Sequence, residues 1–336
     1  EIPLRLVGSE MCIRDSFEAV RHFDLPVLEY APSPGMPVLI DAIRHYYDKL
    51  DMHFDAGDIL ITNGGSEALQ IAFNCILDDG DEILIPEPFY PNYNTMVRTC
   101  GASIHPIPTS PHEGYRYADR ARIEAEINEH TRAIVCTNPG NPTGVVLTPE
   151  EMRMLVDVAK EHGLFIIGDE AYREFSDNPP DTLKFVREGR NVVVLRTFSK
   201  AYGLAGLRVG YGIAPEPVCS MLHKARAPFN LHVLAQEAAL AALEDREHVR
   251  RTVENNKEGM RFYEQAFREM GLEWIPSQGN FILVKVGRGK QVFQDMLARG
   301  VIVRAQDGYG LPEWIRISVG TPAENARCIE VLKEVL

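Results

Sequence analysis

The sequence predicts an α/β protein with a mostly parallel central sheet sandwiched by helices, followed by a smaller α+β domain at the C-terminal end. Two observations lead to this prediction. Up to about residue 243, short apolar runs rich in β-branched residues alternate with helical patterns, which is typical of a parallel sheet covered by helices. From Glu244 the character changes, and a long charge-rich helical stretch runs to Met270 before strands and helices follow in a less regular order.

The apolar runs of the first part are expected to be buried strands, because each is short and bounded by polar or turn-forming residues. They lie at residues 59–62, 82–85, 133–137, 164–168, 192–196 and 208–212. Helical patterns lie at residues 36–50, 66–77, 149–162 and 235–243. None of the apolar runs approaches the ~18 residues that a membrane helix needs, so we expect no membrane partner.

The C-terminal part is expected to contain further strands and helices after the long helix. The strands are expected at residues 281–286, 301–304 and 315–319, and the helices at residues 291–299 and 322–336. We therefore expect a large domain at residues 36–235 and a small domain at residues 236–336, with the remnant of an N-terminal arm at residues 17–35.

The first residues do not look like part of a folded protein. Residues 6–16 read LVGSEMCIRDS, which resembles the translation of an adapter used in sequencing libraries. Scars of this kind are left out of fold reasoning. We expect residues 1–16 to be a non-native scar, the native sequence to begin near Phe17, and a true N-terminal stretch to be missing.

Charge and cysteine content narrow the classes of partner. The chain has 48 acidic and 35 basic residues and a net charge of −13, which repels a nucleic-acid backbone. The six cysteines include no C-x-x-C pair, which favours reduced, mostly buried thiols of a cytoplasmic enzyme over disulfides or a metal site. The sequence also lacks the phosphate-loop, dinucleotide, zinc-protease and serine-hydrolase motifs.

The first candidate site motif is NGGSE at residues 63–67, between an expected strand and an expected helix. Glycines let the backbone approach a ligand closely, and a helix N-terminus offers unpaired N–H groups and the positive end of the helix dipole. The motif therefore suits an anion. An ordinary turn with a serine cap is an equally good interpretation of this motif taken alone.

Two further motifs follow expected strands. Residues 138–144 read NPGNPTG, in which two prolines fix a turn and leave Asn138 and Asn141 as side-chain amide donors. Residues 169–172 read DEAY and place the carboxylate of Asp169 and the phenol of Tyr172 at the carboxyl end of a buried strand. Ligands bind at that edge of an open sheet. Taken alone, DEAY is equally well explained as a solvated loop.

The fourth motif, TFSKAYGLAGLR at residues 197–208, places Lys200 directly after a buried strand among apolar and small residues, where it can act as an amine nucleophile. Most lone lysines are merely solvated. The combination of motifs argues against that interpretation, because pyridoxal phosphate needs this set of groups: an amine, an acid for the pyridine nitrogen, and donors for the phenolate and phosphate oxygens.

From about Phe17 to its end, the sequence resembles the pyridoxal-phosphate aminotransferases of fold type I, class I/II. The resemblance implies a homodimer with shared active sites that takes an amino donor and a 2-oxo acid. It implies catalytic roles for Lys200, Asp169 and Tyr172, with Lys200 as covalent anchor and general base. Asp169 would pair with the pyridine nitrogen, and Asn141 and Tyr172 would hold the ring phenolate.

The resemblance also implies the remaining cofactor contacts. The phosphate would be bound by Gly65, Ser66, Thr197, Ser199 and Arg208, and by Tyr30 reaching in from the second subunit. Tyr93, in the segment EPFYPNYN, would stack on the cofactor ring. In this family an N-terminal arm packs over the active site, so loss of the native N-terminus is expected to weaken substrate affinity.

The two halves resemble different members of the family. The part from about residue 17 to residue 175 resembles aspartate-type aminotransferases, whereas the part from about residue 192 resembles histidinol-phosphate aminotransferases. In the family, Arg316 reads an acidic group of the substrate. A phosphate favours two arginines, and Arg304 in RGVIVR could supply the second, although a surface role for Arg304 remains an alternative.

We therefore expect transamination between histidinol phosphate and 2-oxoglutarate. An aspartate or aromatic amino-acid aminotransferase is the alternative within the family. A lyase or decarboxylase on the same fold is an alternative from another class. A chimera of two genes joined between Phe175 and Asn191 would also explain the different resemblances of the two halves.

Overall fold

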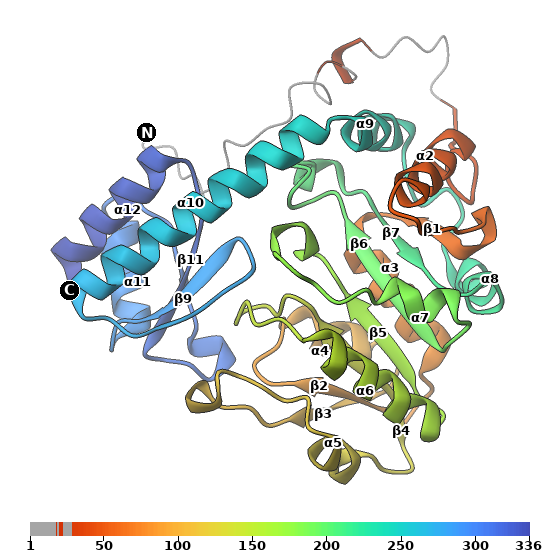
Figure 1. The fold of residues 1–336 in the computed structure, drawn as a ribbon, viewed down its shortest axis with the longest axis horizontal. Coiled ribbons are helices and arrows are strands. Elements are labelled where there is room, and N and C mark those ends of the chain that lie inside the picture. Colours follow the sequence, from red (N-terminus) through yellow and green to blue (C-terminus); the bar gives the residue numbers. More distant parts are fainter. Residues whose placement is uncertain (1–17, 19, 23–28) are drawn as a thin grey trace.

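The computed structural model describes residue 18, residues 20–22 and residues 29–336. The expected scar at residues 1–16 lies outside the described residues, and the expected arm at residues 17–35 is described only in part. The described residues form two sheets, each with its own helices, which lie side by side in Figure 1.

The larger sheet has seven strands in the order β1-β7-β6-β5-β4-β2-β3. Neighbouring strands are parallel except at β7, which runs antiparallel to both β6 and β1. The strands are β1 (Ile59–Thr62), β2 (Glu82–Pro86), β3 (Ser103–Ile107), β4 (Thr131–Thr137), β5 (Phe165–Asp169), β6 (Val192–Thr197) and β7 (Gly210–Ile213). The expected mostly parallel sheet is confirmed.

Helices cover both faces of this sheet, because its strands are apolar on both sides. In β4, Ile134 packs into one apolar cluster and Val135 packs into the other, as the alternation of a strand requires. One cluster contains residues of α2 (Pro37–Asp48), α5 (Arg120–Glu126), α6 (Pro149–Glu161), α7 (Leu183–Arg187) and α9 (Val233–Glu244). The other contains residues of α3 (Gly64–Ile76), α4 (Asn92–Arg98) and α8 (Glu216–Ala225).

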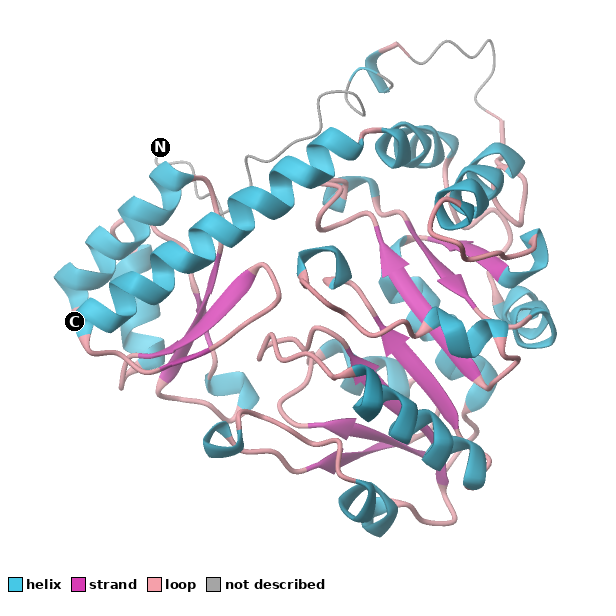
Figure 2. Ribbon diagram, viewed as in Figure 1, coloured by secondary structure: helices cyan, strands magenta, loops and turns pink. Residues whose placement is uncertain are grey.

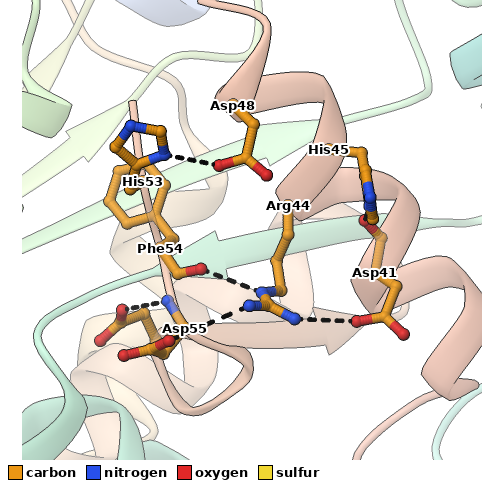
Figure 3. A network of polar contacts seen from close by, with 8 residues as sticks. Asp41, Arg44, His45, Asp48, His53, Phe54 and Asp55 are labelled. Carbon is orange, nitrogen blue, oxygen red and sulfur yellow. Dashed lines mark hydrogen bonds and ion pairs between the residues drawn. The ribbon is translucent and has the colours of Figure 1, made fainter. Parts of the chain in front are cut away.

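A local sequence signal fixes the start of α6. Helix α6 begins with a capping box, in which Thr148 Oγ1 accepts from the backbone N–H of Glu151 and Glu151 accepts from that of Thr148. At the other end of the sheet, Arg44 on α2 donates to the Phe54 carbonyl at 3.0 Å and so ties α2 to the segment that leads into β1 (Figure 3).

The smaller sheet is antiparallel, with the order β10-β11-β9-β8. This sheet and its helices comprise α10 (Arg246–Met270), β8 (Trp274–Ile275), β9 (Phe281–Lys285), α11 (Gly289–Leu297), β10 (Arg304–Ala305), β11 (Trp314–Ser318) and α12 (Pro322–Val335). One face packs against α10, α11 and α12 (Figure 2). The other face carries Phe281, which contacts Tyr172 beside the larger sheet, so this face closes over the ends of β5 and β6.

The expected fold class is therefore confirmed, including the smaller C-terminal α+β part. Two expected elements differ in detail. The expected strand at residues 301–304 is reduced to β10, which pairs with β11 only at Arg304 and Ala305. The expected helix from Glu244 to Met270 is present as α10 but begins at Arg246, because the Asp245 side chain caps it by accepting from the backbone N–H of His248.

The described residues contain no helix long and apolar enough to cross a membrane. They also contain no group of three or more histidine, cysteine or acidic residues able to hold a metal ion. The described cysteines are free, and Cys136, Cys219 and Cys328 are buried as expected, whereas Cys75 is exposed.

Candidate active site

The carboxyl ends of β4, β5 and β6 meet at one edge of the larger sheet. Thr137 is paired with Asp169 across β4 and β5, and Asp169 with Leu195 across β5 and β6. A cavity of about 170 Å³ opens at this edge. Its lining includes the expected site residues Gly65, Ser66, Tyr93, Asn141, Asp169, Tyr172, Thr197, Ser199, Lys200 and Arg208.

Groups suited to binding an anion lie where α3 begins. The side chain of Asn63, the residue before α3, does not hydrogen-bond to the first turn of that helix. The first backbone N–H groups of α3 are therefore not capped by Asn63. A Cβ added to Gly64 would lie 2.6 Å from Arg208 Nη2, so glycine allows the guanidinium to approach the backbone. Arg208 Nη1 donates to Ser199 Oγ at 3.2 Å, and Ser199 accepts from Thr197 Oγ1 at 2.9 Å.

Asp169 is the acidic group of the cavity. It accepts from the Tyr93 hydroxyl at 2.7 Å and from the Ala171 backbone N–H at 3.1 Å. Burial raises the pKa of the Asp169 carboxyl, and these two donors oppose the rise. A cationic N–H donor entering the cavity would compensate this carboxylate, as a protonated pyridine nitrogen does.

Tyr93 differs from its expected position as a stacking residue. It lies in the first turn of α4, its side chain is fully buried, and its hydroxyl is 2.7 Å from Thr137 Oγ1 as well as bonded to Asp169. This arrangement orients the carboxylate. Tyr90, which precedes α4, is only partly buried and lines the same cavity, so it presents a ring there that sequence reasoning missed.

The lining of this cavity also includes an amide, a phenol and an amine, from Asn141, Tyr172 and Lys200. Asn141 Nδ2 donates to the Tyr172 hydroxyl at 3.4 Å, and Asn141 Oδ1 accepts from Arg316 Nη1. Lys200 Nζ lies 5.1 Å from the centre of the Tyr172 ring. The amine, the amide and the phenol therefore converge on one region, although they come from three different loops.

A larger cavity of about 1030 Å³ adjoins the first and shares Ser199 and Lys200 with it. Arg304 and Arg316 line this larger cavity. Arg316 is partly buried, and its Nε is buried with no hydrogen-bond partner among the described residues. Burial lowers the pKa of Arg316, and the nearby charge of Arg304 lowers it further. Two guanidinium groups that line one cavity, Arg304 exposed and Arg316 with an unpartnered Nε, are suited to an anion.

A buried ion pair, which sequence reasoning missed, lies on the chain directly beside two cavity residues. Glu170 follows Asp169 and Arg196 precedes Thr197, and Arg196 Nη2 donates to Glu170 Oε2 at 2.7 Å. Both side chains are almost fully buried. The DEAY and LRTFSK segments contain both charges, but only the pairing of β5 with β6 shows that they meet.

Tyr30, which we expect to reach the cofactor phosphate from the second subunit, lines neither cavity of its own chain. Its side chain is 78% exposed and stacks on the ring of Phe229 at 4.5 Å between centroids. Phe229 is itself 52% exposed. The two stacked rings lie at the surface and line neither cavity.

The chain belongs to the class I and II aminotransferases: residues 21–332 match the family described as "Aminotransferase class I and II". It is therefore a transaminase. Among curated proteins, it is 70% identical over 280 residues to histidinol-phosphate aminotransferase of Akkermansia muciniphila, which covers 83% of this chain and 76% of that protein. It is 40% identical over 321 residues to histidinol-phosphate aminotransferase 2 of Carboxydothermus hydrogenoformans, covering 89% of this chain and 87% of that protein.

Solved structures agree with this assignment. The aspartate aminotransferase of Thermotoga maritima has a TM-score of 0.88 at 25% identity, covering 96% of this chain and 88% of that one. The relative from Akkermansia muciniphila covers 83% of the chain, so its match extends across residues 175–191. A junction between two genes is therefore not needed to explain the sequence.

Proposed function

We propose that this transaminase transfers the amino group of histidinol phosphate to 2-oxoglutarate, with pyridoxal 5′-phosphate as cofactor. The observation that carries the proposal is the pair Arg304 and Arg316 in the cavity that adjoins Lys200. A phosphate carries a charge of nearly −2 and suits two guanidinium groups, whereas a carboxylate is satisfied by one. The histidinol-phosphate aminotransferases named above support the same substrate.

The described residues fit the cofactor in their chemistry. The phosphate would be bound at the start of α3 by Gly65 and Ser66, with help from Thr197, Ser199 and Arg208. The pyridine nitrogen would pair with Asp169. The phenolate would accept from Asn141 and Tyr172, which already lie within hydrogen-bond distance of each other. When bound, pyridoxal phosphate supplies an electron sink for the bonds at the α-carbon of the substrate.

Each polar residue of the cavity has a separate part in the reaction. Lys200 Nζ would hold the cofactor covalently at rest and, once freed by the amino donor, would take the α-proton and return it. Asp169 would keep the pyridine nitrogen protonated, and Tyr93 would hold the Asp169 carboxylate in place. Tyr90 would lie against the ring in the position that we expected Tyr93 to occupy.

In the second half-reaction, 2-oxoglutarate would use the same large cavity. Its distal carboxylate needs one arginine fork, which Arg316 can provide with its unpartnered Nε. Arg316 is bonded to Asn141, so a substrate anion that recruits Arg316 would also act on the amide that faces Tyr172. Anion binding and cofactor binding would thereby share one hydrogen-bonded chain.

The proposal is tested by assaying the purified protein with histidinol phosphate, aspartate and phenylalanine, each with 2-oxoglutarate. We expect glutamate formation with histidinol phosphate at the highest kcat/KM. Turnover of aspartate or phenylalanine without histidinol phosphate would overturn the substrate assignment. Ammonia or carbon dioxide without glutamate would instead indicate a lyase or a decarboxylase. In Lys200→Ala, the absorbance band of the covalently bound cofactor should be lost.

We also propose that the enzyme is a homodimer with a large domain at residues 36–235 and a small domain at residues 236–336. Exposed apolar side chains support the dimer, because Tyr30 and Phe229 stack on each other at the surface and Val38 is also exposed. Free thiols suit the cytoplasm. In sedimentation measurements, Phe229→Asp should yield monomers, whereas the exposed control Phe262→Asp should remain dimeric.

A further inference from the structure

Tyr309 lies in the turn between the two strands that carry the cavity arginines. This turn, η5 (Asp307–Tyr309), connects β10 to β11. The Gln306 carbonyl accepts from the backbone N–H of Tyr309 at 3.0 Å and from that of Leu311 at 3.1 Å. Gln306 itself is fully buried. Gln306 also donates its backbone N–H to the Trp314 carbonyl of β11 at 3.1 Å, so the backbone of the turn is anchored to the sheet.

The Tyr309 side chain faces the two arginines. It lines the large cavity together with Arg304 and Arg316, and Arg304 Cζ lies 5.9 Å from the centre of its ring. Burial raises the pKa of the Tyr309 phenol, and the guanidinium groups of Arg304 and Arg316 oppose the rise. The phenol thus stays protonated near neutral pH and has a hydrogen to donate.

The same segment also forms a wall. Gly308 and Tyr309 border both the large cavity and a second one of about 410 Å³, which Tyr115 lines. Tyr309 is thus part of the wall between the two cavities, and it shares the large cavity with Arg304, Arg316 and the carboxylate of its neighbour Asp307. The substitution Tyr309→Phe keeps the ring in this wall and removes only the hydroxyl, so the effect of the hydroxyl can be measured separately from that of the ring.

We propose that Tyr309 is a specificity-determining residue, whose hydroxyl donates to the phosphate of the substrate beside Arg304 and Arg316. The inference deepens the function proposed above and rests on it. A phosphate monoester presents three terminal oxygens, so two guanidinium groups leave acceptor sites for a third donor, whereas a carboxylate has two oxygens that one arginine fork occupies. Tyr309 therefore favours histidinol phosphate over dicarboxylates.

The experiment compares the wild-type holoenzyme with Tyr309→Phe, using histidinol phosphate and 2-oxoglutarate as varied substrates and inorganic phosphate as a competitive inhibitor. We expect kcat/KM for histidinol phosphate to fall about 10- to 100-fold, because a hydrogen bond to a charged group is lost. The loss should appear mainly in KM, since the phosphate is remote from the reacting carbon and is bound equally in the ground and transition states. The Ki of inorganic phosphate should rise by a similar factor.

The matched control is Tyr115→Phe. Tyr115 borders the same segment from the other cavity, and its buried hydroxyl has no hydrogen-bond partner among the described residues. This variant should keep wild-type constants for both substrates, and Tyr309→Phe should keep its KM for 2-oxoglutarate within about threefold.

Three outcomes are decisive. A Tyr309→Phe enzyme with an unchanged KM for histidinol phosphate and an unchanged Ki for phosphate overturns the inference while leaving the proposed function intact. An equal loss for both substrates also overturns it, because the hydroxyl would then not discriminate phosphate from carboxylate. A wild-type enzyme that does not turn over histidinol phosphate overturns the proposed function itself.

Discussion

Arg304 and Arg316 lie directly opposite each other in the pairing of β10 with β11, so their side chains leave the same face of the sheet. Like charges in this arrangement repel, and both residues line the cavity that includes Lys200. A chain does not gain stability from such a pair. The arrangement becomes favourable when an anion lies between the two guanidinium groups, which is the physical basis of the proposed phosphate site.

Removing Arg304 should separate the two substrates. We expect Arg304→Gln to lower kcat/KM for histidinol phosphate about 100-fold and that for 2-oxoglutarate far less, because Arg316 still binds a carboxylate. The ligand-free variant should be slightly more stable, by about 0.2–1 kcal/mol, since the cross-strand repulsion is gone. Steady-state kinetics and urea unfolding measure the two effects. Arg288→Gln, at an exposed arginine outside the cavity linings described above, is the control.

The Asp169 carboxyl should make the ligand-free protein less stable as the pH rises. Burial raises its pKa in the folded state, so the folded protein holds this proton more tightly than the unfolded chain, where the pKa is about 3.9. Its contribution to stability is therefore fully present below about pH 4 and is lost as the pH rises through the folded-state pKa.

Asp169→Asn should accordingly raise the free energy of unfolding of the cofactor-free protein at pH 7.5 and change it little near pH 4. Transamination should fall by at least about 100-fold, because the pyridine nitrogen loses its acid partner. Urea titrations at the two pH values test the first statement. A variant that is less stable than the wild type at pH 7.5 would contradict it.

The buried pair of Glu170 and Arg196 should respond differently from exposed ion pairs. Arg196→Met removes the partner that donates two hydrogen bonds to the buried Glu170 carboxylate and leaves it the contact with Arg173 Nε at 3.3 Å, so we expect a loss of about 3–5 kcal/mol in the free energy of unfolding. The double variant Glu170→Met/Arg196→Met should be more stable than either single variant. Arg250→Met is the control: its pairs with Glu247 and Glu254 are exposed, and the change should stay below about 1 kcal/mol.

Gly64 should be needed for the cofactor phosphate site. An alanine Cβ at this position would displace the Arg208 guanidinium, so Gly64→Ala should raise the Kd of pyridoxal phosphate by about tenfold or more. Gly80→Ala is the matched control, because Gly80 also has a positive φ (+84°) but no described atom lies within 4 Å of an added Cβ. Fluorescence titration of the cofactor-free proteins measures both. Equal losses in the two variants would attribute the effect to backbone strain.

Much of the candidate site could be predicted because it follows strand ends. In parallel strands the carboxyl ends meet at one edge, so the motifs that contain Asp169 and Lys200 had to converge once the strands were recognised. Tyr90 and Tyr93 could not be told apart in the same way. Helix α4 was not expected, and its start at Asn92 is what turns Tyr93 into the interior.

Pairings between distant segments could not be predicted from the sequence either. Both arginines of the anion site were expected, but their juxtaposition depends on the register of β10 with β11, and a strand of two residues carries almost no periodic signal. Tyr309 was passed over for a related reason. Its segment DGYG looks like an ordinary turn until Arg304 and Arg316 are placed on either side of it.

The edge position of β1 has a consequence for synthesis of the protein. Its sheet partner is β7 alone, which is encoded roughly 150 residues later. At about 5–20 residues per second, translation needs roughly 8–30 seconds to reach that partner. During this interval the start of α3, which follows β1, has neither its strand neighbour nor Arg208. A nascent chain can therefore complete the proposed phosphate site at the start of α3 only after β7 has left the ribosome. Binding of the cofactor would then indicate that the large sheet is complete.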